Sequence, residues 1–418
     1  MTSSVVVVSL RAGDWLGPCL DSVRDQTDQL VVVDNGSADA GVSEVARRYG
    51  ATVVRNRVNQ GFAGGANQGI RRATGEMVAL LNDDAVADPT WLSTAASALD
   101  DATVAAVTPK VLLDGWFAQV VPTGEAWYAP PDPRPLGQKL LSVGCGGSEV
   151  LAQVVGPGVY PLEAGTDNGA PVTWRWTRPG RPYYVPLPEG GRDADIVING
   201  TEPVAVDGVC RLVNNTGLYL RSDGYSGDHG LETPDDGRFD LPCHPFGVSG
   251  TAMAARADVF RSVGLLAEPF FAYYEDTDWS WRARRLGLRL AYSPSASISH
   301  RRSVTSATTL GSRVRILGER NRLLCLIRNA PREVAVAEVR RRIVDGPDHG
   351  VRRGMLRHAP WAMATRVQLD RRSKVGTGDL WDEWAGADVT WDDGPTPFDP
   401  SDPGDPTGPT PAHEVEGG

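Results

Sequence analysis

Residues 30–37 read LVVVDNGS, an apolar run that ends in a polar cluster. Similar apolar runs occur at Val5–Val8 and Met77–Leu81. Amphipathic stretches such as Trp15–Val23 and Val42–Tyr49 lie between the runs. This alternation predicts strands and helices that build an α/β fold around a parallel, doubly wound sheet.

Polar clusters follow the predicted strands or the loops beside them. They are Asp34–Ser37, Asn59–Gly61 and Asn82–Asp84. Sheets of this class bind ligands beyond the carboxyl ends of their strands. The sequence therefore predicts a ligand site where these clusters meet.

Length and composition bound the class of protein. With 418 residues and 41% hydrophobic content, we expect two or three packed units. The five cysteines are far apart and form no C-x-x-C pair, which favours neither a disulfide framework nor a zinc site and fits a reducing cytoplasm. The N-terminal apolar run lacks the lead-in and length of a signal peptide, and we expect no transmembrane helix.

The charge of the chain is unevenly distributed. The net charge is −10, and residues 375–418 contain 11 acids and no lysine or arginine. Residues 332–374 are instead basic, with an apolar patch at Pro360–Met363. Two interpretations stay open for them: helices that lie on an anionic surface, or helices packed on the domain with solvated arginines. Because no basic stripe with interleaved aromatic residues appears elsewhere, no nucleic-acid partner is expected.

Carboxylates form two clusters. Asn82-Asp83-Asp84 directly follows a predicted strand, where oxygen ligands suit Mg²⁺ or Mn²⁺, although Asp and Asn are also common in turns. The second cluster, Glu275-Asp276-Thr277-Asp278, precedes several arginines. It either suits a helix dipole, with Asp278 paired to Arg282, or raises the pKa of one carboxyl toward that of a general base.

His300 ends another apolar run, 24 residues after Asp276. A lone histidine is more often structural than a ligand. Displacement at a sugar carbon with a diphosphate leaving group needs three features together. They are a histidine that could bind metal, a carboxylate cluster, and a carboxylate whose pKa is shifted toward that of a general base.

Four motifs follow one another along the chain: VVVDNGS at residues 31–37, NQGFAGGAN at 59–67, LLNDD at 80–84 and FFAYYEDTD at 270–278. In this order they resemble the motifs of the family 2 glycosyltransferases. The resemblance is closest to the bacterial branch of rhamnosyltransferase-like and galactofuranosyltransferase-like enzymes. It covers about Val5–Asp114 and Arg211–Asn329.

The resemblance implies a GT-A fold, a doubly wound mixed sheet with helices on both faces, joined here by a β-rich insert and C-terminal helices. It also implies an inverting single displacement. Matched position by position, Asp276 is the catalytic base, with Glu275 and Asp278 as supporting acids. Asp84 and His300 are implied ligands of a divalent Mg or Mn ion.

The same resemblance implies a nucleotide-sugar site. Its expected residues are Asp34, Asn35, Asn59, Gly61, Asn67, Asn82, Asp83 and Gly250. Asp34 and Asn35 would contact the nucleobase or ribose, and the loop from Asn59 to Asn67 would close over the nucleotide. Two positions depart from the family pattern: Asn82 holds the first place of the D-x-D motif, and Ser9-Leu10-Arg11 replaces a common Asn-Tyr-Asn segment.

Five segments are expected along the chain. Residues 1–114 would form the nucleotide-sugar-binding half of the GT-A domain and residues 211–329 its acceptor and catalytic half. Residues 115–210, rich in Pro, Gly and short alternating runs, would be an inserted β-rich module. Residues 330–375 would be a basic helical extension, and residues 376–418 an acidic, largely disordered tail.

The expected activity is transfer of a sugar from a nucleotide-diphosphate donor, such as dTDP-rhamnose or a UDP-sugar, to a glycan or polyprenyl-linked acceptor hydroxyl. The setting would be polysaccharide synthesis at the bacterial cell envelope, in the cytoplasm, with peripheral contact of residues 332–374 at the inner face of the membrane. Two alternatives stay open: a non-catalytic glycan-binding or scaffold protein on a transferase fold, and a sugar nucleotidyltransferase.

Overall fold

The computed structural model describes residues 1–122, 128, 134–167, 170–189, 191, 194–200, 204–301, 313–344 and 349–385. The chain forms two compact units. Among the described residues, the first contains Met1–Leu112, Asn215–His229 and residues 238–385, and the second contains Leu113–Asn214 and Gly230–Gly237. All predicted site residues belong to the first unit, so its fold determines how they meet.

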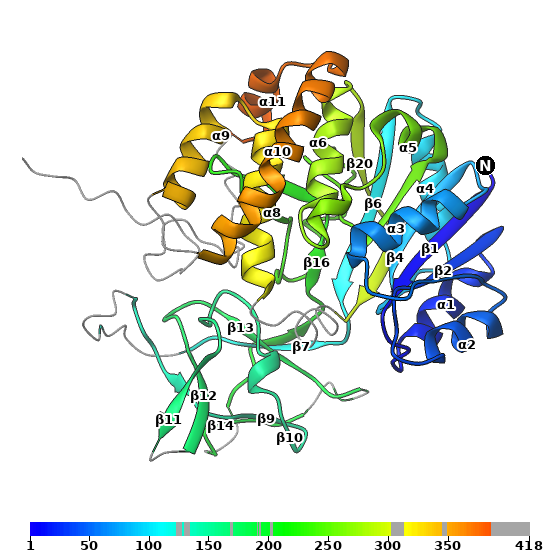
Figure 1. Cartoon of the computed structure of the whole chain (residues 1–418). Coiled ribbons are helices and arrows are strands. Elements are labelled where there is room, and N and C mark those ends of the chain that lie inside the picture. The colour runs from blue at the N-terminus through cyan, green and yellow to red at the C-terminus, as the bar shows by residue number, and fades with distance from the viewer. Residues whose placement is uncertain are drawn as a thin grey trace, which may run out of the picture. The chain divides into compact units, whose positions relative to one another are not determined.

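A mixed sheet forms the centre of the first unit, with strand order β3-β2-β1-β4-β19-β6-β20-β5 (Figure 1). The first four strands of this order are parallel, and β19 runs antiparallel to β4. The strands are β1 Ser3–Ser9, β2 Gln29–Asp34, β3 Thr52–Arg55, β4 Met77–Asn82, β5 Ala85–Ala87, β6 Val104–Leu113, β19 Ala252–Arg256 and β20 Arg289–His300. Chain reversal at β19 makes the sheet mixed.

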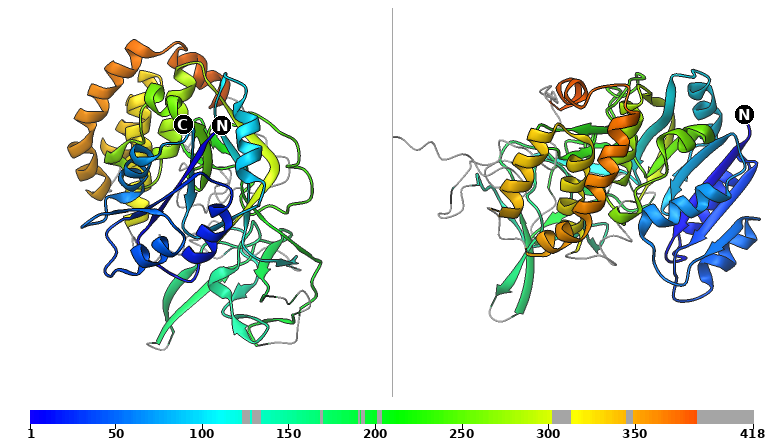
Figure 2. Two further views of the ribbon diagram at one scale, coloured as in Figure 1. Left: turned by 90° about the vertical axis from the view of Figure 1, so that its right-hand side faces the viewer. Right: turned by 45° about the horizontal axis from the view of Figure 1, so that its top comes forward.

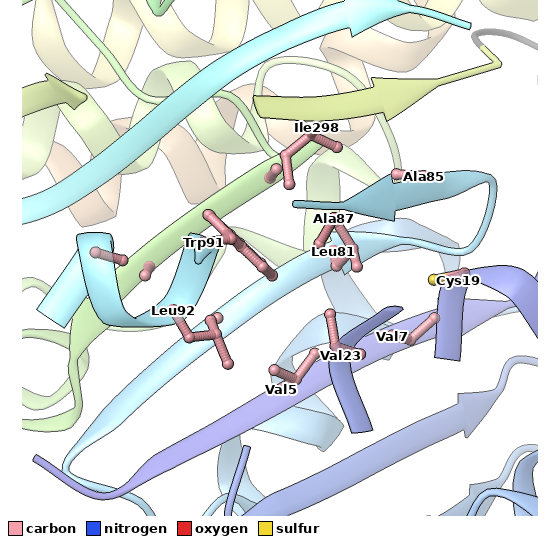
Figure 3. Packing of buried hydrophobic residues seen from close by; sticks show 14 of the residues in the cluster. Val5, Val7, Cys19, Val23, Leu81, Ala85, Ala87, Trp91, Leu92 and Ile298 are labelled. Carbon is pink, nitrogen blue, oxygen red and sulfur yellow. The ribbon is translucent and has the colours of Figure 1, made fainter. Parts of the chain in front are cut away.

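Helices cover both faces of this sheet because its buried strands are apolar on both sides. Val5 and Val7 of β1 pack with α1 Leu16–Arg24, α2 Gly41–Arg48 and α4 Trp91–Leu99 (Figure 3). Val6 faces the other way, toward α3 Gly61–Arg72, α5 Ala257–Val263 and α6 Glu275–Arg285. The predicted α/β mixed sheet with helices on both faces is confirmed.

Helix α3 lies unusually close to β1. A Cβ atom at Gly69 would stand 2.2 Å from Val6 Cγ1, and one at Gly65 would stand 2.7 Å from Val8 Cγ1. Glycine at these positions therefore lets the helix backbone approach the strand. This approach holds the loop before α3 beside the carboxyl ends of β1 and β2.

The C-terminal helices of the first unit surround a separate core. These are α8 Arg313–Asn329, α9 Arg332–Val339, the π-helix Arg340–Val344, α10 His349–Arg372 and α11 Thr377–Trp384. Helices α8 and α10 run side by side (Figures 1 and 2). Trp381 of α11 stacks on Trp281 of α6 with ring centroids 5.9 Å apart. The start of the predicted acidic tail is thus helical, whereas residues 386–418 lie outside the described residues.

Two short elements complete the first unit. A hairpin pairs β17 Leu218–Leu220 with β18 Ser226–Asp228, and a 3-10 turn, Glu268–Phe270, precedes α6. Across the described ranges, every helix is too short or too polar to cross a bilayer. All five cysteine thiols are free.

The second unit is built from short antiparallel strands, as the composition of residues 115–210 indicated. One sheet joins β13, β7 and β15, another joins β10, β9 and β14, and a third joins β11, β12 and β8. The strands are β7 Phe117–Val120, β8 Lys139–Leu140, β9 Val143–Cys145, β10 Ser148–Glu149, β11 Glu163–Asp167, β12 Ala170–Trp176, β13 Tyr183–Pro186, β14 Ile196–Ile198 and β15 Gly208–Cys210. The second unit also contains the 3-10 turn Leu151–Gln153. The short strand β16 Val213–Asn215 includes the point where the chain passes from the second unit to the first.

Candidate active site

The carboxyl ends of the parallel strands bring three polar residues to one edge of the sheet. Ser9 is in register with Asp34, and Val8 is in register with Asn82. The start of β19 lies at the same edge, because the Asn82 amide donates a hydrogen bond to the Thr251 carbonyl at 2.9 Å. This edge is where an open α/β sheet binds ligands.

Asp84 and His300 form a buried pair at this edge. His300 ends β20 and pairs in register with Ala85, the residue that follows Asp84. His300 Nε2 lies 3.1 Å from Asp84 Oδ1, and each side chain is 7% exposed. Asn82 Nδ2 lies 3.4 Å from His300 Nε2. The structure thus brings these residues together, and their role as metal ligands stays a prediction.

The Asp84 carboxylate and the His300 imidazole fit a divalent ion whose remaining coordination positions are filled by oxygens of a bound substrate and water. Among the described residues, no group of three or more His, Cys, Asp or Glu side chains is arranged to hold a metal by itself. Mg²⁺ is commonly held by one or two protein groups together with substrate phosphates and water. One carboxylate and one imidazole, both buried, match such a shared site.

Asp83 follows β4, beside Asp84, and contacts Ser9 at the end of β1. Burial raises its pKa to about 7, a hydrogen bond with the Ser9 hydroxyl acts to lower it, and the Asp84 carboxylate acts to raise it. A second anion next to Asp84 is thus disfavoured at neutral pH. This carboxyl was expected to contact the nucleotide sugar.

Asp276 sits in the first turn of α6 and is held by backbone donors. Its Oδ2 accepts a hydrogen bond from the Gly250 amide at 2.9 Å, and its Oδ1 accepts one from the Thr277 amide at 2.7 Å. Burial raises the pKa of Asp276, although these two hydrogen bonds act to lower it. Because Gly250 and Thr251 are adjacent, short hydrogen bonds link Asp276 to the strand end that carries Asn82.

Glu275 precedes Asp276 and is more deeply buried. Burial, followed by the neighbouring Asp276 carboxylate, raises its pKa well above the usual range. Its Oε2 makes no hydrogen bond among the described residues. A neutral carboxyl that can donate a proton is the form that this environment favours.

Asp278 is not available as a supporting acid, in contrast to the sequence prediction. Its oxygens lie 2.8 Å from Arg282 Nε and 3.2 Å from Arg328 Nε, and Asn329 Nδ2 donates to it at 2.9 Å. Burial acts to raise its pKa, but Arg328 and Arg282 outweigh that effect and lower it. The alternative i,i+4 ion pair with Arg282 is the arrangement observed.

Asp34 and Asn35 tie the strand end to the neighbouring loops. Asp34 Oδ2 accepts from the Ser43 hydroxyl at 2.6 Å. Asn35 Nδ2 donates to Asn59 Oδ1 at 3.1 Å and to the Gly61 carbonyl at 2.9 Å. Both side chains are buried at the expected edge, and much of their hydrogen-bonding capacity is used within the protein.

Asn67, which was predicted to bind the donor, uses its side-chain amide within the protein. Its Nδ2 donates to the Leu266 carbonyl at 2.9 Å and to Glu268 Oε1 at 3.0 Å, and its Oδ1 accepts from the Leu266 amide at 2.9 Å. A buried amide with these partners joins α3 to the segment before α6. Asn67 is therefore a structural residue.

Gly61 brings the loop before α3 against the segment before α6. Its φ is +74°, and a Cβ atom there would stand 2.3 Å from the Phe271 carbonyl oxygen. The Ala63 amide donates to the same carbonyl at 3.2 Å. Glycine is thus required both by the backbone conformation and by the close approach.

The segment before α6 is strained, and residues that the sequence reasoning missed hold it. Phe271, Tyr273 and Tyr274 have φ values of 68°, 71° and 69°, which only glycine adopts readily. Asn321 Nδ2, fully buried on α8, donates to the carbonyls of Phe270, Ala272 and Tyr273 at 2.9, 2.8 and 2.7 Å. No sequence pattern near Asn321 predicts this contact, because its partners lie about fifty residues earlier in the chain.

Comparison with known proteins bears on the same region. Residues 4–143 match the family model described as glycosyl transferase family 2. EpsH of Bacillus subtilis strain 168, described as a provisional glycosyltransferase, is 32% identical over 95 residues, 21% of this chain and 27% of that protein. YibD of Escherichia coli K12, an uncharacterised glycosyltransferase, is 31% identical over 140 residues, 31% of this chain and 38% of that protein. The matches thus span between about a quarter and two fifths of these relatives.

Among solved structures, the chain is similar to GalNAc-T7, crystallised with UDP, GalNAc and Mn²⁺. The TM-score is 0.48 at 14% identity, over 87% of this chain and 56% of that one. A likeness at this level says nothing about the ligands or mechanism of this chain. The match of residues 4–143 to the family model covers less than half of the chain and includes Asp34, Asn35 and Asp84.

Proposed function

We propose that this protein is an inverting, metal-dependent glycosyltransferase that moves a sugar from a nucleotide diphosphate to an acceptor hydroxyl. One observation carries the proposal. Asp276, whose pKa is raised by burial, is linked through Gly250 and Thr251 to the sheet edge that holds the Asp84 and His300 pair. A candidate base and a candidate metal pair thus belong to one hydrogen-bonded framework.

In this proposal, Asp84 and His300 hold a Mg or Mn ion, which would neutralise charge on the departing diphosphate. The acceptor oxygen forms a bond to the anomeric carbon while the bond from that carbon to the diphosphate oxygen breaks. Asp276 accepts the proton of the acceptor hydroxyl. The Gly250 and Thr277 amides orient the Asp276 carboxylate for this task.

The donor side is proposed to involve the loops that Asn35 and Gly61 join. Backbone and side-chain atoms of Asp34, Asn35, Asn59, Gly61, Asn82, Asp83 and Gly250 border the sheet edge or its adjoining loops. A nucleotide bound there would lie beyond the carboxyl ends of β1 and β2. A dTDP-sugar such as dTDP-rhamnose, or a UDP-sugar, is the proposed donor on the basis of the resemblance of the motifs.

The acceptor is proposed to be a glycan or lipid-linked hydroxyl used in bacterial cell-envelope or surface polysaccharide synthesis, with transfer of a hexose. The proposed place of work is the cytoplasm, including the inner face of the cytoplasmic membrane. The basic helices of residues 332–374 are the part of the chain whose composition suits contact with an anionic membrane.

The Asp276→Asn variant tests the assignment of the base. It keeps the size of the side chain and one of its two acceptor oxygens but cannot take a proton. We expect binding of the donor nucleotide to persist and transfer to fall by about 10²-fold to 10⁴-fold, the usual contribution of general base catalysis. Asp21→Asn, at an exposed position on α1, is the matched control and should leave both unchanged.

Normal turnover by the Asp276→Asn variant would show that Asp276 is not the catalytic base. Glycan binding without turnover by the native chain would instead indicate a non-catalytic glycan-binding protein. Release of pyrophosphate from a nucleoside triphosphate would indicate a sugar nucleotidyltransferase.

A further inference from the structure

Helix α10 has one buried side and, on another side, an exposed apolar stripe. Val351, Met355 and Ala362 are buried against the C-terminal core. Leu356, Met363 and Val367 are instead 73%, 55% and 50% exposed. Spacings of seven and four residues place these three side chains along one side of the helix.

Arginines border this apolar stripe. Arg352, Arg353, Arg357 and Arg371 are exposed on α10. In the described ranges, none of these four guanidinium groups makes an ion pair or a hydrogen bond with another side chain or carbonyl. Arg366 differs, because its Nη1 donates to the Ile327 and Ala330 carbonyls at 2.9 and 2.8 Å. Arg366 thus helps to hold α10 on α8, whereas the four arginines that border the stripe face solvent.

Basic residues outnumber acidic ones within α10. Asp370 is the single acid in α10, and its carboxylate is paired with Arg285 and with Arg366. The pKa of His358, on the flank of the helix, is lowered by burial, then by Arg320 and by Arg357. A neighbouring histidine thus experiences the positive potential that Arg357 contributes.

Other basic and aromatic residues of the segment 332–374 are not part of this surface. Arg341 pairs with Glu338 at 2.7 Å, and Arg342 pairs with Glu319 at 3.1 Å. Trp361 packs edge-on against Phe270 with centroids 5.9 Å apart. Packing on the domain therefore accounts for these residues, whereas it does not account for the exposed stripe.

We propose that the exposed face of α10 is a docking surface for an anionic lipid bilayer. Leu356, Met363 and Val367 enter the boundary between headgroups and acyl chains, and the bordering arginines pair with lipid phosphates. An amphipathic helix with an apolar stripe and a basic border binds membranes in this way, lying in the interface plane. The proposal rests on the membrane contact proposed above for residues 332–374, assigns it to one side of α10, and does not depend on the catalytic assignments.

Cosedimentation of the full chain with vesicles tests the proposal. Vesicles of phosphatidylcholine with phosphatidylglycerol should bind the protein, and binding should weaken as salt is added. Pure phosphatidylcholine vesicles should bind it much less. Replacing Arg353 and Arg357 by Gln should weaken binding about fivefold for each charge removed, from the usual gain per cation near an anionic surface.

Variants separate the apolar stripe from overall charge. The triple variant Leu356→Gln, Met363→Gln, Val367→Gln should lose binding at unchanged net charge, while its melting temperature stays near that of the native chain because all three side chains are exposed. Arg47→Gln with Arg48→Gln, on α2, is the control for charge, and Leu241→Gln is the control for an exposed apolar residue. Both controls should bind vesicles like the native chain.

Three results would overturn the proposal. The native protein could stay in the supernatant with anionic vesicles, or the variants on α10 could bind vesicles as well as the native chain. Light scattering could also show a dimer that the triple variant disperses, which would make a second copy of this chain the partner of the stripe.

Discussion

Asp276 and Asp278 lie two residues apart on α6, yet the protein surrounds their carboxylates differently. Asp276 is held by backbone amides, and burial raises its pKa. Asp278 is fully buried between Arg282 and Arg328, which lower its pKa. Helical spacing predicts the contact with Arg282, but the contact with Arg328 depends on how α8 packs. Sequence alone could therefore not decide which acid is free to accept a proton.

The pH dependence of transfer should reflect the raised pKa of Asp276. A base must be deprotonated to act, so transfer should be lost as pH falls through that raised pKa. The acid limb should consequently lie above the range of an ordinary aspartate, about 3.9. The measurement is kcat/KM against pH with saturating metal, and an acid limb at or below the ordinary aspartate value would contradict the assignment.

Asp278→Asn should chiefly affect stability. Removing this carboxylate leaves the Arg282 and Arg328 charges buried with fewer partners, which typically costs about 3–5 kcal/mol. Urea unfolding measures the free energy of unfolding directly. The exposed Asp21→Asn variant should change it by less than about 0.5 kcal/mol. A folded, stable but inactive Asp278→Asn protein would instead restore a catalytic role.

At the scale of elements, the site depends on two segments that meet before α3 and before α6. Gly61 approaches the Phe271 carbonyl, and Asn321 holds the strained backbone from Phe270 to Tyr273. The motifs NQGFAGGAN and FFAYYEDTD identify both segments in the sequence. They do not reveal the contact between them, and they do not reveal that Asn67 serves this junction.

Gly61→Ala should disturb this junction far more than an ordinary strained glycine would. Gly50 is the matched control, because its φ is +71° but a Cβ atom there would meet nothing within 4 Å. Gly50→Ala should cost only the left-handed backbone penalty, about 1–2 kcal/mol, and keep transfer. Gly61→Ala should lose more stability and most activity. If Gly61→Ala and Gly50→Ala had equal effects in the unfolding and transfer assays, the close approach of Gly61 to the Phe271 carbonyl would be unimportant.

Asn321→Ala should act on catalysis through the position of α6. Three carbonyls lose their donor, so the strained segment should relax and Asp276 should move relative to Gly250. We expect kcat to fall at least about tenfold, as misplacement of a catalytic group commonly causes, while KM for the donor changes little. Gln368→Ala, exposed on α10, is the control. A change in stability with unchanged kcat would reduce Asn321 to a structural role.

At the scale of the whole molecule, the parallel part of the sheet was the most predictable. Its strands and helices alternate locally, so apolar periodicity identifies β1, β2 and β4 and the ligand edge that they share. The return of β19 and β20 to this sheet was not predictable from periodicity, because partners more than a hundred residues apart are selected by packing. The second unit was predictable only in its β-rich character, which carries no functional signal.

The pairing of Asp84 with His300 joins these scales. It needs the parallel strand β4, after which Asp84 lies, the strand β20, which ends at His300, and the short edge strand β5, which follows Asp84 and pairs with β20. The family motif supplies Asp84, but only the completed sheet brings His300 to it. The proposed metal-dependent nucleotide binding would therefore depend on strands from both ends of the first unit.

The most direct test of the account is the melting temperature of the full chain with UDP, dTDP, GDP or CDP, each with Mn²⁺ or with chelator. A ligand that binds only the native state must raise the melting temperature. We predict a rise with one nucleotide that requires Mn²⁺, is lost in Asp84→Ala and persists in Asp276→Asn. No rise with any nucleotide, or an equal rise in metal and in chelator, would contradict a metal-dependent glycosyltransferase.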